Sequence, residues 1–338
     1  MESNTQVRVK SWPDGAPLAT DFEIVETSMP RPAEGQVLVR SLFLSLDPYY
    51  RHVLGPRFMG RALCGPGDLM FGTILGEVIE SRTSALVVDD IVVFDAGWQS
   101  FAVGEPHNMR RLDRSIFGKH GVPLETALSV LGLPGLTAFI AINEMARLKL
   151  GDTFVVSSAA GGVGGMAGQL AKRLGARAVG IAGGPEKCAL VTNTLGFDAC
   201  VNYHADQWIE ALAEATPSGI DVDLENHGGK VHAAVLPRMN IHGRIIMCGL
   251  VEQYNDNAIP PPGPSWGAII GKRLTVQGIT VADWLHRYAD LETRIAPMIR
   301  EGSLIWKEDI TQGLASAPAA FEKLMAGRNV GKSLVRLA

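Results

Sequence analysis

Residues 153–165 read Thr-Phe-Val-Val-Ser-Ser-Ala-Ala-Gly-Gly-Val-Gly-Gly, and this stretch decides the fold. It opens with an apolar run, Phe154-Val155-Val156, which is typical of a buried strand. After a turn of small residues, apolar side chains recur at the spacing of one helix face, at Val163, Met166, Ala167, Leu170, Ala171 and Leu174. A strand, a glycine turn and a helix together form a pyrophosphate site, because the start of the helix offers free N–H groups and a positive dipole end.

The turn is a variant of the dinucleotide-binding fingerprint. Ala159 stands where that fingerprint has its first glycine, and Gly161 and Gly164 hold the second and third places. Small residues also let a helix pack closely on a strand, so packing is a second explanation of the same pattern. Residues 179–182 then form a second apolar strand, as a nucleotide-binding unit requires.

The end of this second strand indicates which dinucleotide is bound. An NAD site has an acidic residue there, which bonds the ribose 2′-hydroxyl. Here Gly183-Gly184-Pro185 follows the strand, and the nearest basic residue is Lys187, one turn inside the next helix. A glycine tip leaves room for a 2′-phosphate that Lys187 can pair with, so we predict NADP. The alternative is that Lys187 is an ordinary solvated residue.

Composition excludes several classes of function. A chain of 338 residues with 46% hydrophobic residues predicts two well-buried domains. Its 31 basic and 35 acidic residues give a net charge of −4 without a dense basic block, which argues against a nucleic-acid or membrane partner. No secretory segment or membrane span is evident, and the 4 cysteines are scattered, so we expect a cytoplasmic protein without disulfides.

The chain changes character near residue 131. Residues 1–130 contain short strands broken by Gly and Pro, at 36–46, 71–80 and 91–94, which predicts a compact β domain. Residues 131–300 alternate strands and helices, which predicts a doubly wound α/β domain with strands at 154–157, 179–182, 200–202, 220–225, 244–248 and 274–279. Residues 301–338 are expected to return to the first domain. Asp223 departs from the apolar pattern of a central parallel strand, and the sequence offers no reason for it.

Five motifs, spread over nearly the whole chain, resemble one family. They are Leu-Ser-Leu-Asp-Pro-Tyr-Tyr-Arg at 44–51, Gly-Leu-Pro-Gly-Leu-Thr-Ala at 132–138, the glycine turn, Gly196-Phe197-Asp198 with Asn202-Tyr203, and Asn329-Val330-Gly331-Lys332. The family is the zinc-independent medium-chain dehydrogenase/reductases that reduce conjugated carbon–carbon double bonds, such as prostaglandin, 2-alkenal and curcumin reductases. The resemblance implies a GroES-like β domain, a Rossmann domain and an active site between them. It also implies a homodimer, often joined through the strand at 274–279.

The resemblance implies a set of residues that contact NADPH. They are Thr137, Ala160, Gly161, Gly162, Val163, Gly164, Gly183, Lys187, Tyr203, Asn226, Cys248, Gly249 and Asn329. Thr137, Tyr203 and Asn329 each have a plainer alternative, as a helix residue, a rim residue and a turn residue. The family's Asp-Asn-Val-Gly-Gly reads Glu225-Asn226-His227-Gly228-Gly229 here, and we expect His227 at the polar rim of the site.

The implied chemistry needs aligned reactants and one hydrogen-bond donor. NADPH delivers a hydride to the β-carbon of an enone or enal, and negative charge then builds on the carbonyl oxygen. Tyr254 matches the family's Ser-x-Tyr-Asn, with Glu252 in place of the serine, and a phenol with a pKa of about 10 donates without titrating at pH 7. Its alternative is a surface tyrosine, and the cofactor's ribose hydroxyl can share the role. Tyr49 is expected to line the substrate cleft, and the proline-rich residues 260–264 to form a stiff wall beside it.

Other chemistries fit less well. The zinc alcohol dehydrogenases carry a Cys ligand and a Gly-His-Glu motif, and Met70-Phe71-Gly72-Thr73 stands in that region. His227 and His232 are five residues apart, so a helix does not stack them on one metal, and we predict none. The main hypothesis is an NADPH-dependent enone reductase. Its alternatives are a zinc-independent quinone reductase and a non-catalytic NADPH-binding sensor.

Overall fold

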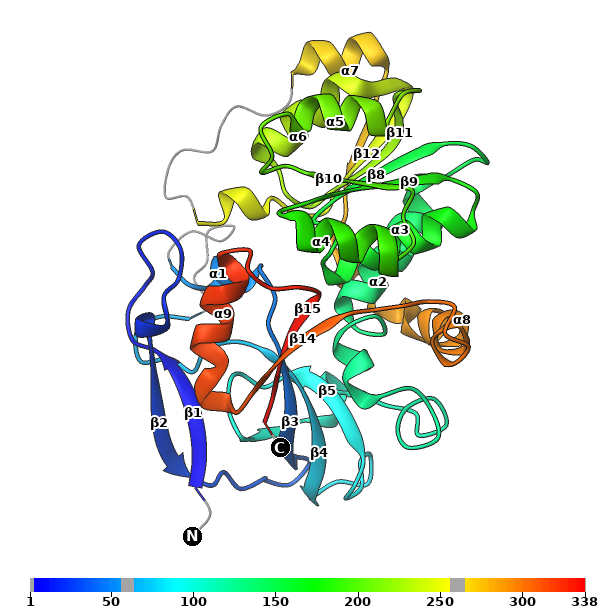
Figure 1. The fold of residues 1–338 in the computed structure, drawn as a ribbon. Coiled ribbons are helices and arrows are strands. Elements are labelled where there is room, and N and C mark those ends of the chain that lie inside the picture. The colour runs from blue at the N-terminus through cyan, green and yellow to red at the C-terminus, as the bar shows by residue number, and fades with distance from the viewer. Residues whose placement is uncertain (1–2, 56–63, 256–264, 338) are drawn as a thin grey trace. The chain divides into compact units, whose positions relative to one another are not determined.

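The computed structural model describes residues 3–55, 64–255 and 265–337, so the proline-rich wall expected at 260–264 lies outside the described residues. The chain divides into two compact units (Figure 1). The first unit comprises residues 1–128 and 308–338, and the second comprises residues 129–307. Within the described ranges, no helix combines the length and the apolar character needed to cross a bilayer.

The first unit is built on two sheets whose strand pairs are antiparallel, except that β14 and β15 run parallel. β1 (Ser3–Val9) pairs with β2 (Phe22–Ser28). A 7-stranded sheet contains, in spatial order, β14 (Glu308–Gln312), β15 (Lys332–Arg336), β3 (Val37–Ser45), β4 (Thr73–Ser81), β5 (Ile91–Asp95) and β7 (Arg110–Arg111), with β6 (Phe101–Gly104) paired to β3. The sequence predicted β3, β4 and β5. It missed the polar strand β14, because Glu-Asp-Ile-Thr-Gln has no apolar run for a pattern to detect.

Short helices complete the first unit. They are η1 (Ala19–Asp21), α1 (Tyr50–Val53), η2 (Pro106–Asn108), η3 (Leu124–Leu128), η9 (Leu314–Ser316) and α9 (Ala317–Met325). The ring of Phe321 in α9 packs edge-on against fully buried Trp98 at 5.7 Å, and Trp98 stacks on Phe22 at 5.6 Å. The C-terminal tail is therefore part of this unit's core, as the red helix beside the blue strands in Figure 1 shows.

The second unit is a 6-stranded parallel sheet in the order β10-β9-β8-β11-β12-β13, which confirms the predicted doubly wound fold. Its strands are β8 (Thr153–Ser157), β9 (Arg177–Ala182), β10 (Ala199–Asn202), β11 (Ile220–Glu225), β12 (Met239–Met247) and β13 (Thr275–Gly278). The direction of winding reverses between β8 and β11. The carboxyl ends of these two strands are therefore the edge at which such sheets bind ligands.

Helices cover both faces of this sheet (Figure 1). The helices of the second unit are α2 (Leu133–Ile140), η4 (Ala141–Ala146), α3 (Gly162–Arg173), α4 (Pro185–Ala189), η5 (Leu190–Thr194), α5 (Trp208–Ala215), α6 (Gly229–Val235), η6 (Leu236–Arg238), η7 (Val251–Gln253), α7 (Trp266–Lys272), η8 (Val281–Arg287) and α8 (Tyr288–Arg300). On the face covered by α5 and α6, Leu212 and Val231 join Val155, Val179 and Ile245 in one buried apolar cluster. This cluster fixes how α6 lies over the strand ends.

Candidate nucleotide-binding and catalytic site

The glycine turn leaves the start of α3 open to a ligand. β8 ends at Ser157, Ser158 adopts a left-handed conformation with φ 54°, and α3 begins at Gly162. Gly161 occupies the N-cap position, and no side chain caps the N–H groups of the first turn. A helix start with uncapped N–H groups attracts anions through its dipole and its free donors. The turn is thus built to receive a phosphate.

Glycine occupies the two fingerprint positions for different structural reasons. A Cβ on Gly164 would lie 2.6 Å from the Ser158 carbonyl oxygen and 2.8 Å from Ala159 Cα, so packing of α3 on the turn requires glycine there. A Cβ on Gly161 would meet only the Ser158 oxygen, at 3.2 Å. The protein's own packing does not demand glycine at Gly161. Close approach by a ligand does explain it.

The tip of β9 is surrounded by polar rings. A Cβ on Gly183 would lie 2.9 Å from His204 Nε2 and 3.1 Å from Tyr203 Oη, so these side chains lie against the glycine. The Nζ of Lys230 lies 5.1 Å from the centre of the Tyr203 ring. Burial, together with the charges of Lys230, His227 and Lys187, lowers the pKa of His204. Two lysines therefore place positive charge at this strand tip.

Lys230 was not predicted from the sequence. It follows Gly228-Gly229 at the first turn of α6, 43 positions after Lys187, and it reaches the tip of β9 only because the sheet places β9 and β11 on either side of β8. The spacing of residues within either segment does not predict that the two segments lie close together. The one available signal is a basic residue directly after the two glycines that follow β11 and begin α6.

The end of β11 is locked to the end of β8 by one carboxylate. Glu225 Oε1 accepts hydrogen bonds from Ser157 Oγ at 2.5 Å and from the N–H groups of His227 and Gly228 at 2.6 and 3.0 Å. Asn226 Nδ2 donates to the Ser157 carbonyl oxygen at 3.0 Å. Burial opposes ionisation of Glu225, but its contact with His232 and its hydrogen bonds bring the pKa below the ordinary value. The expectation for His227 was wrong: it is 9% exposed and packs on Tyr203.

Tyr254 lies beside the end of β12. The N–H groups of Cys248 and Gly249 donate to the Glu225 carbonyl oxygen, at 2.8 and 3.1 Å. A Cβ on Gly249 would lie 3.2 Å from Tyr254 Oη, and that oxygen accepts a bond of 3.3 Å from the Leu250 N–H. Burial raises the pKa of Tyr254 and raises that of Cys248 to about 12. The Tyr254 phenol is therefore neutral at pH 7 and keeps a proton to donate.

Thr137 is bonded within its own helix. Its hydroxyl donates to the Leu133 carbonyl oxygen at 2.8 Å, and the residue is 7% exposed. It lies in the middle of α2 rather than at its start. A threonine hydroxyl that donates backwards along its helix still presents lone pairs, so Thr137 can accept one further bond.

In the first unit, the Tyr49 ring packs edge-on against Tyr50 and Phe71, with ring centres 4.7 and 6.4 Å apart, and burial raises its pKa. Asn329 Nδ2 donates to the Gly331 carbonyl oxygen at 2.8 Å, which is a turn contact.

Two of the family motifs are joined by an ion pair that the sequence did not predict. Lys332 Nζ lies 2.9 Å from Asp47 Oδ1 and donates to the Leu46 carbonyl oxygen at 2.6 Å, and Lys332 is 5% exposed. The pair ties the returning tail to the segment before α1, across 285 positions of sequence.

Comparison with known proteins agrees with this geometry. Residues 5–112 match a family model described as the N-terminal domain of oxidoreductase, and residues 162–297 match one described as zinc-binding dehydrogenase. The NADPH-dependent curcumin reductase of Escherichia coli is 38% identical, covering 100% of this chain and 98% of the relative. The 2-alkenal reductase of Nicotiana tabacum is 36% identical, covering 99% and 98%. The chain belongs to the double-bond reductases of the medium-chain dehydrogenase/reductase superfamily.

Solved structures of this reductase family share the whole architecture. The crystal structure of CurA from Vibrio vulnificus in complex with NADPH superimposes with a TM-score of 0.93 at 36% identity, covering 99% of both chains. Rat prostaglandin reductase 1 is 36% identical over 98% of this chain and 99% of its own. Both units and the returning tail therefore fall inside the family's common framework.

Residues 70–73 of the first unit do not form a site for a catalytic zinc. In residues 70–73, Met70 is fully buried and a Cβ on Gly72 would lie 2.5 Å from the Trp98 ring. Thr73 Oγ1 donates to Asp95 at 2.5 Å. An apolar side chain, a glycine and an occupied hydroxyl offer a zinc ion none of its preferred ligands.

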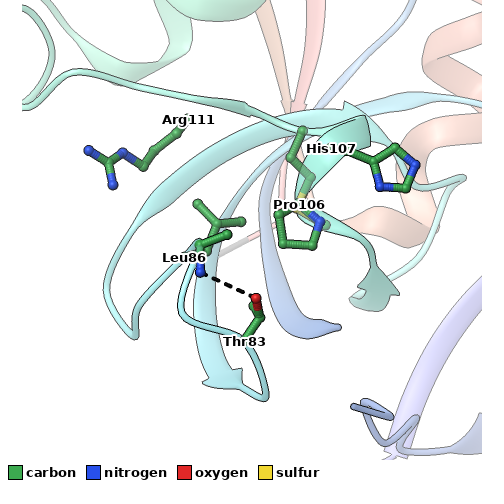
Figure 2. A pocket seen from close by; sticks show the side chains of 7 residues that line it. Thr83, Leu86, Pro106, His107 and Arg111 are labelled. Carbon is green, nitrogen blue, oxygen red and sulfur yellow. Dashed lines mark hydrogen bonds between the residues drawn. The ribbon is translucent and has the colours of Figure 1, made fainter. Parts of the chain in front are cut away.

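A surface hollow in the first unit contains none of the predicted site residues (Figure 2). It is lined by Thr83, Ala85, Leu86, Pro106, His107, Met109 and Arg111. Figure 2 shows Leu86 and Pro106 facing the hollow, with His107 and Arg111 at its margins. The hollow belongs to the first unit, whereas the nucleotide turn belongs to the second unit.

Proposed function

We propose that this reductase transfers a hydride from NADPH to the β-carbon of α,β-unsaturated ketones and aldehydes. The observation that carries the proposal is the position of Tyr254: its neutral, half-buried hydroxyl lies next to Gly249, at the same sheet edge as the open start of α3. Relatives that span the full chain carry the names curcumin reductase and 2-alkenal reductase. NADPH is the cofactor, and those relatives are named as using it.

The cofactor's pyrophosphate is assigned to residues 160–164, at the uncapped helix start. Lys187, Tyr203 and Lys230, around Gly183, are assigned to the 2′-phosphate, because two ammonium groups and a phenol suit a dianion. The nicotinamide half of the cofactor is assigned to the edge formed by Asn226, Cys248 and Gly249. Thr137 is assigned as a further hydrogen-bond acceptor for this half. Asn329 and Tyr49 are proposed contacts from the first unit.

The reaction balances with one proton from the protein or solvent. When bound, NADPH supplies the hydride. The electron pair of the double bond moves to the carbonyl oxygen, which becomes an enolate and needs a hydrogen-bond donor. Tyr254 donates that bond, and a proton delivered to the α-carbon completes the saturated product. Because burial keeps the pKa of Tyr254 high, the phenol stays protonated through the neutral range.

The proposal is tested with purified protein, NADPH and a panel of short enones and enals. We expect loss of the reduced-nicotinamide absorbance together with formation of the saturated carbonyl compound. Oxidation of NADPH by quinones alone indicates a quinone reductase. Tight NADPH binding without turnover on either panel indicates a sensor. Either of these outcomes contradicts the proposal.

We further propose that two copies join at β13. This strand ends the order of the 6-stranded sheet, and all of its residues are exposed, with Val276 at 39%. A bare strand edge pairs readily with a second strand. The neighbouring side chains of Trp266 and Ile270, each 74% exposed, add apolar surface. Light scattering of the parent protein should give twice the mass of one chain. Val276→Pro should reduce this mass to that of a single chain. A parent protein with the mass of one chain contradicts the proposal.

A further inference from the structure

Three ionisable side chains converge inside the second unit, beneath the nucleotide edge. Asp223 and Glu225 alternate along β11 and therefore point to the same face of the sheet. His232 reaches this face from α6. One ligand atom from each of the three residues lies within 4.8 Å of the other two. Both carboxylates are 0% exposed, and the imidazole side chain is 13% exposed.

Five polar atoms of this cluster form no hydrogen bond with the protein. Both oxygens of Asp223, Oε2 of Glu225 and both ring nitrogens of His232 have no hydrogen-bond partner. The closest contact among them is the 3.5 Å ion pair between His232 Nδ1 and Glu225 Oε2. A buried polar atom without a partner costs about 1–3 kcal/mol. Five such atoms meeting at one point are more than a folded sheet normally carries.

The surroundings of Asp223 make the cluster more unusual. In the sheet, Asp223 is flanked by Val155 of β8 and Ile245 of β12. Val155, Ile245 and Val231 of α6 all belong to the buried apolar cluster of this face. Among the residues that the structure describes, neither carboxylate has a Lys or Arg partner. Negative charge on Asp223 is therefore not balanced by a lysine or an arginine among these residues.

We propose that Asp223, Glu225 and His232 bind one divalent transition-metal ion of the zinc type. Two carboxylate oxygens and one imidazole nitrogen are zinc ligands, whereas Mg²⁺ and Ca²⁺ prefer oxygen alone. Ligand atoms on one tetrahedral zinc lie roughly 3.4 Å apart, so side-chain rotations of about 1 Å bring the three donors to the ion. The ion supplies the missing positive charge and a partner for each free lone pair, and water can take the fourth position.

The role of this ion is structural, and it acts on the nucleotide edge. Glu225 holds the ion through Oε2, while its Oε1 keeps the bonds to Ser157 and to the N–H groups of His227 and Gly228. Fixing this carboxylate therefore fixes the loop that follows β11. This site belongs to the second unit, whereas residues 70–73, which stand where the zinc dehydrogenases' motif is expected, belong to the first. The proposal therefore departs from the sequence-based prediction of no metal.

The first test uses the intact chain and Co²⁺ as a spectroscopic probe for zinc. After removal of metal with a chelator, the protein should bind one Co²⁺ per chain with a visible d–d absorption band, and Zn²⁺ should abolish the band whereas Mg²⁺ should not. Zinc at about 100 times its dissociation constant should raise the melting temperature by about 5 °C. Absence of both effects, in protein that still binds NADPH, overturns the proposal.

The second test locates the ion. Asp223→Asn and His232→Leu should each weaken Co²⁺ binding at least about 10-fold, while His120→Leu, at an exposed histidine of the first unit, should leave it unchanged. Equal Co²⁺ affinity in all three variants contradicts the proposal. If a variant does not fold, anomalous scattering from crystals of the zinc-loaded parent protein decides the question. A peak among Asp223, Glu225 and His232 supports the site, and a peak elsewhere refutes it.

Discussion

The two fingerprint glycines should respond to substitution in opposite ways. Gly161 is in an extended conformation, with φ −87° and ψ 177°, and an added Cβ meets one oxygen at 3.2 Å. Gly161→Val should therefore cost less than about 1 kcal/mol of stability. Its side chain would fill the space in front of the uncapped N–H groups. Loss of one charge-assisted bond to a phosphate costs about 1.5–3 kcal/mol, which is about a 10- to 150-fold weaker affinity for NADPH.

Gly164→Ala is the matched control, because its Cβ would overlap main-chain atoms at 2.6 and 2.8 Å that cannot move independently. Overpacking of this kind costs about 1–3 kcal/mol, so the melting temperature should fall by about 2–6 °C. Calorimetry of unfolding and titration of NADPH fluorescence measure the two quantities on the same samples. Unchanged NADPH affinity in Gly161→Val, or unchanged stability in Gly164→Ala, would refute the separation of roles.

Four other substitutions test the rest of the site and the contact that holds the C-terminal tail. Lys187→Ala and Lys230→Ala should each weaken NADPH binding about 10-fold while leaving NADH binding unchanged, as measured by parallel titrations; equal losses for both cofactors would remove the 2′-phosphate assignment. Tyr254→Phe should lower kcat at least about 10-fold without changing the affinity for NADPH. Because burial raises the pKa of Tyr254, kcat of the parent protein should show no ionisation of this group between about pH 6 and 9. Lys332→Ala should lower the free energy of unfolding by about 3–5 kcal/mol, because it removes the ion-pair partner of the largely buried Asp47. Denaturant unfolding measures this change. A loss below about 1 kcal/mol would show that the pair does not hold the tail.

The second unit was predictable because its determinants are local. The run from Phe154 to Leu174 contains an apolar strand, a small-residue turn and a periodic helix, and each pattern needs only neighbouring residues to form. The strands of the first unit were harder to predict, since β14 is polar and half-buried and owes its existence to pairing with β15.

The missed features of the site are contacts across long stretches of sequence. Lys230 meets Tyr203 only through the order of the sheet, and Lys332 meets Asp47 across most of the chain. Asp223 looked like an error in a central strand until the structure placed Glu225 and His232 beside it. The departure from the apolar pattern therefore marks a member of the proposed metal site, whose other members the sequence could not supply.

The fate of the transferred hydride tests the central claim most directly. The protein is incubated with NADPH carrying deuterium at both C4 positions and with a short enone, and the product is analysed by NMR. Deuterium on the β-carbon of a saturated ketone is the predicted result. Deuterium on a carbinol carbon, with the double bond intact, would show carbonyl reduction and would contradict the account.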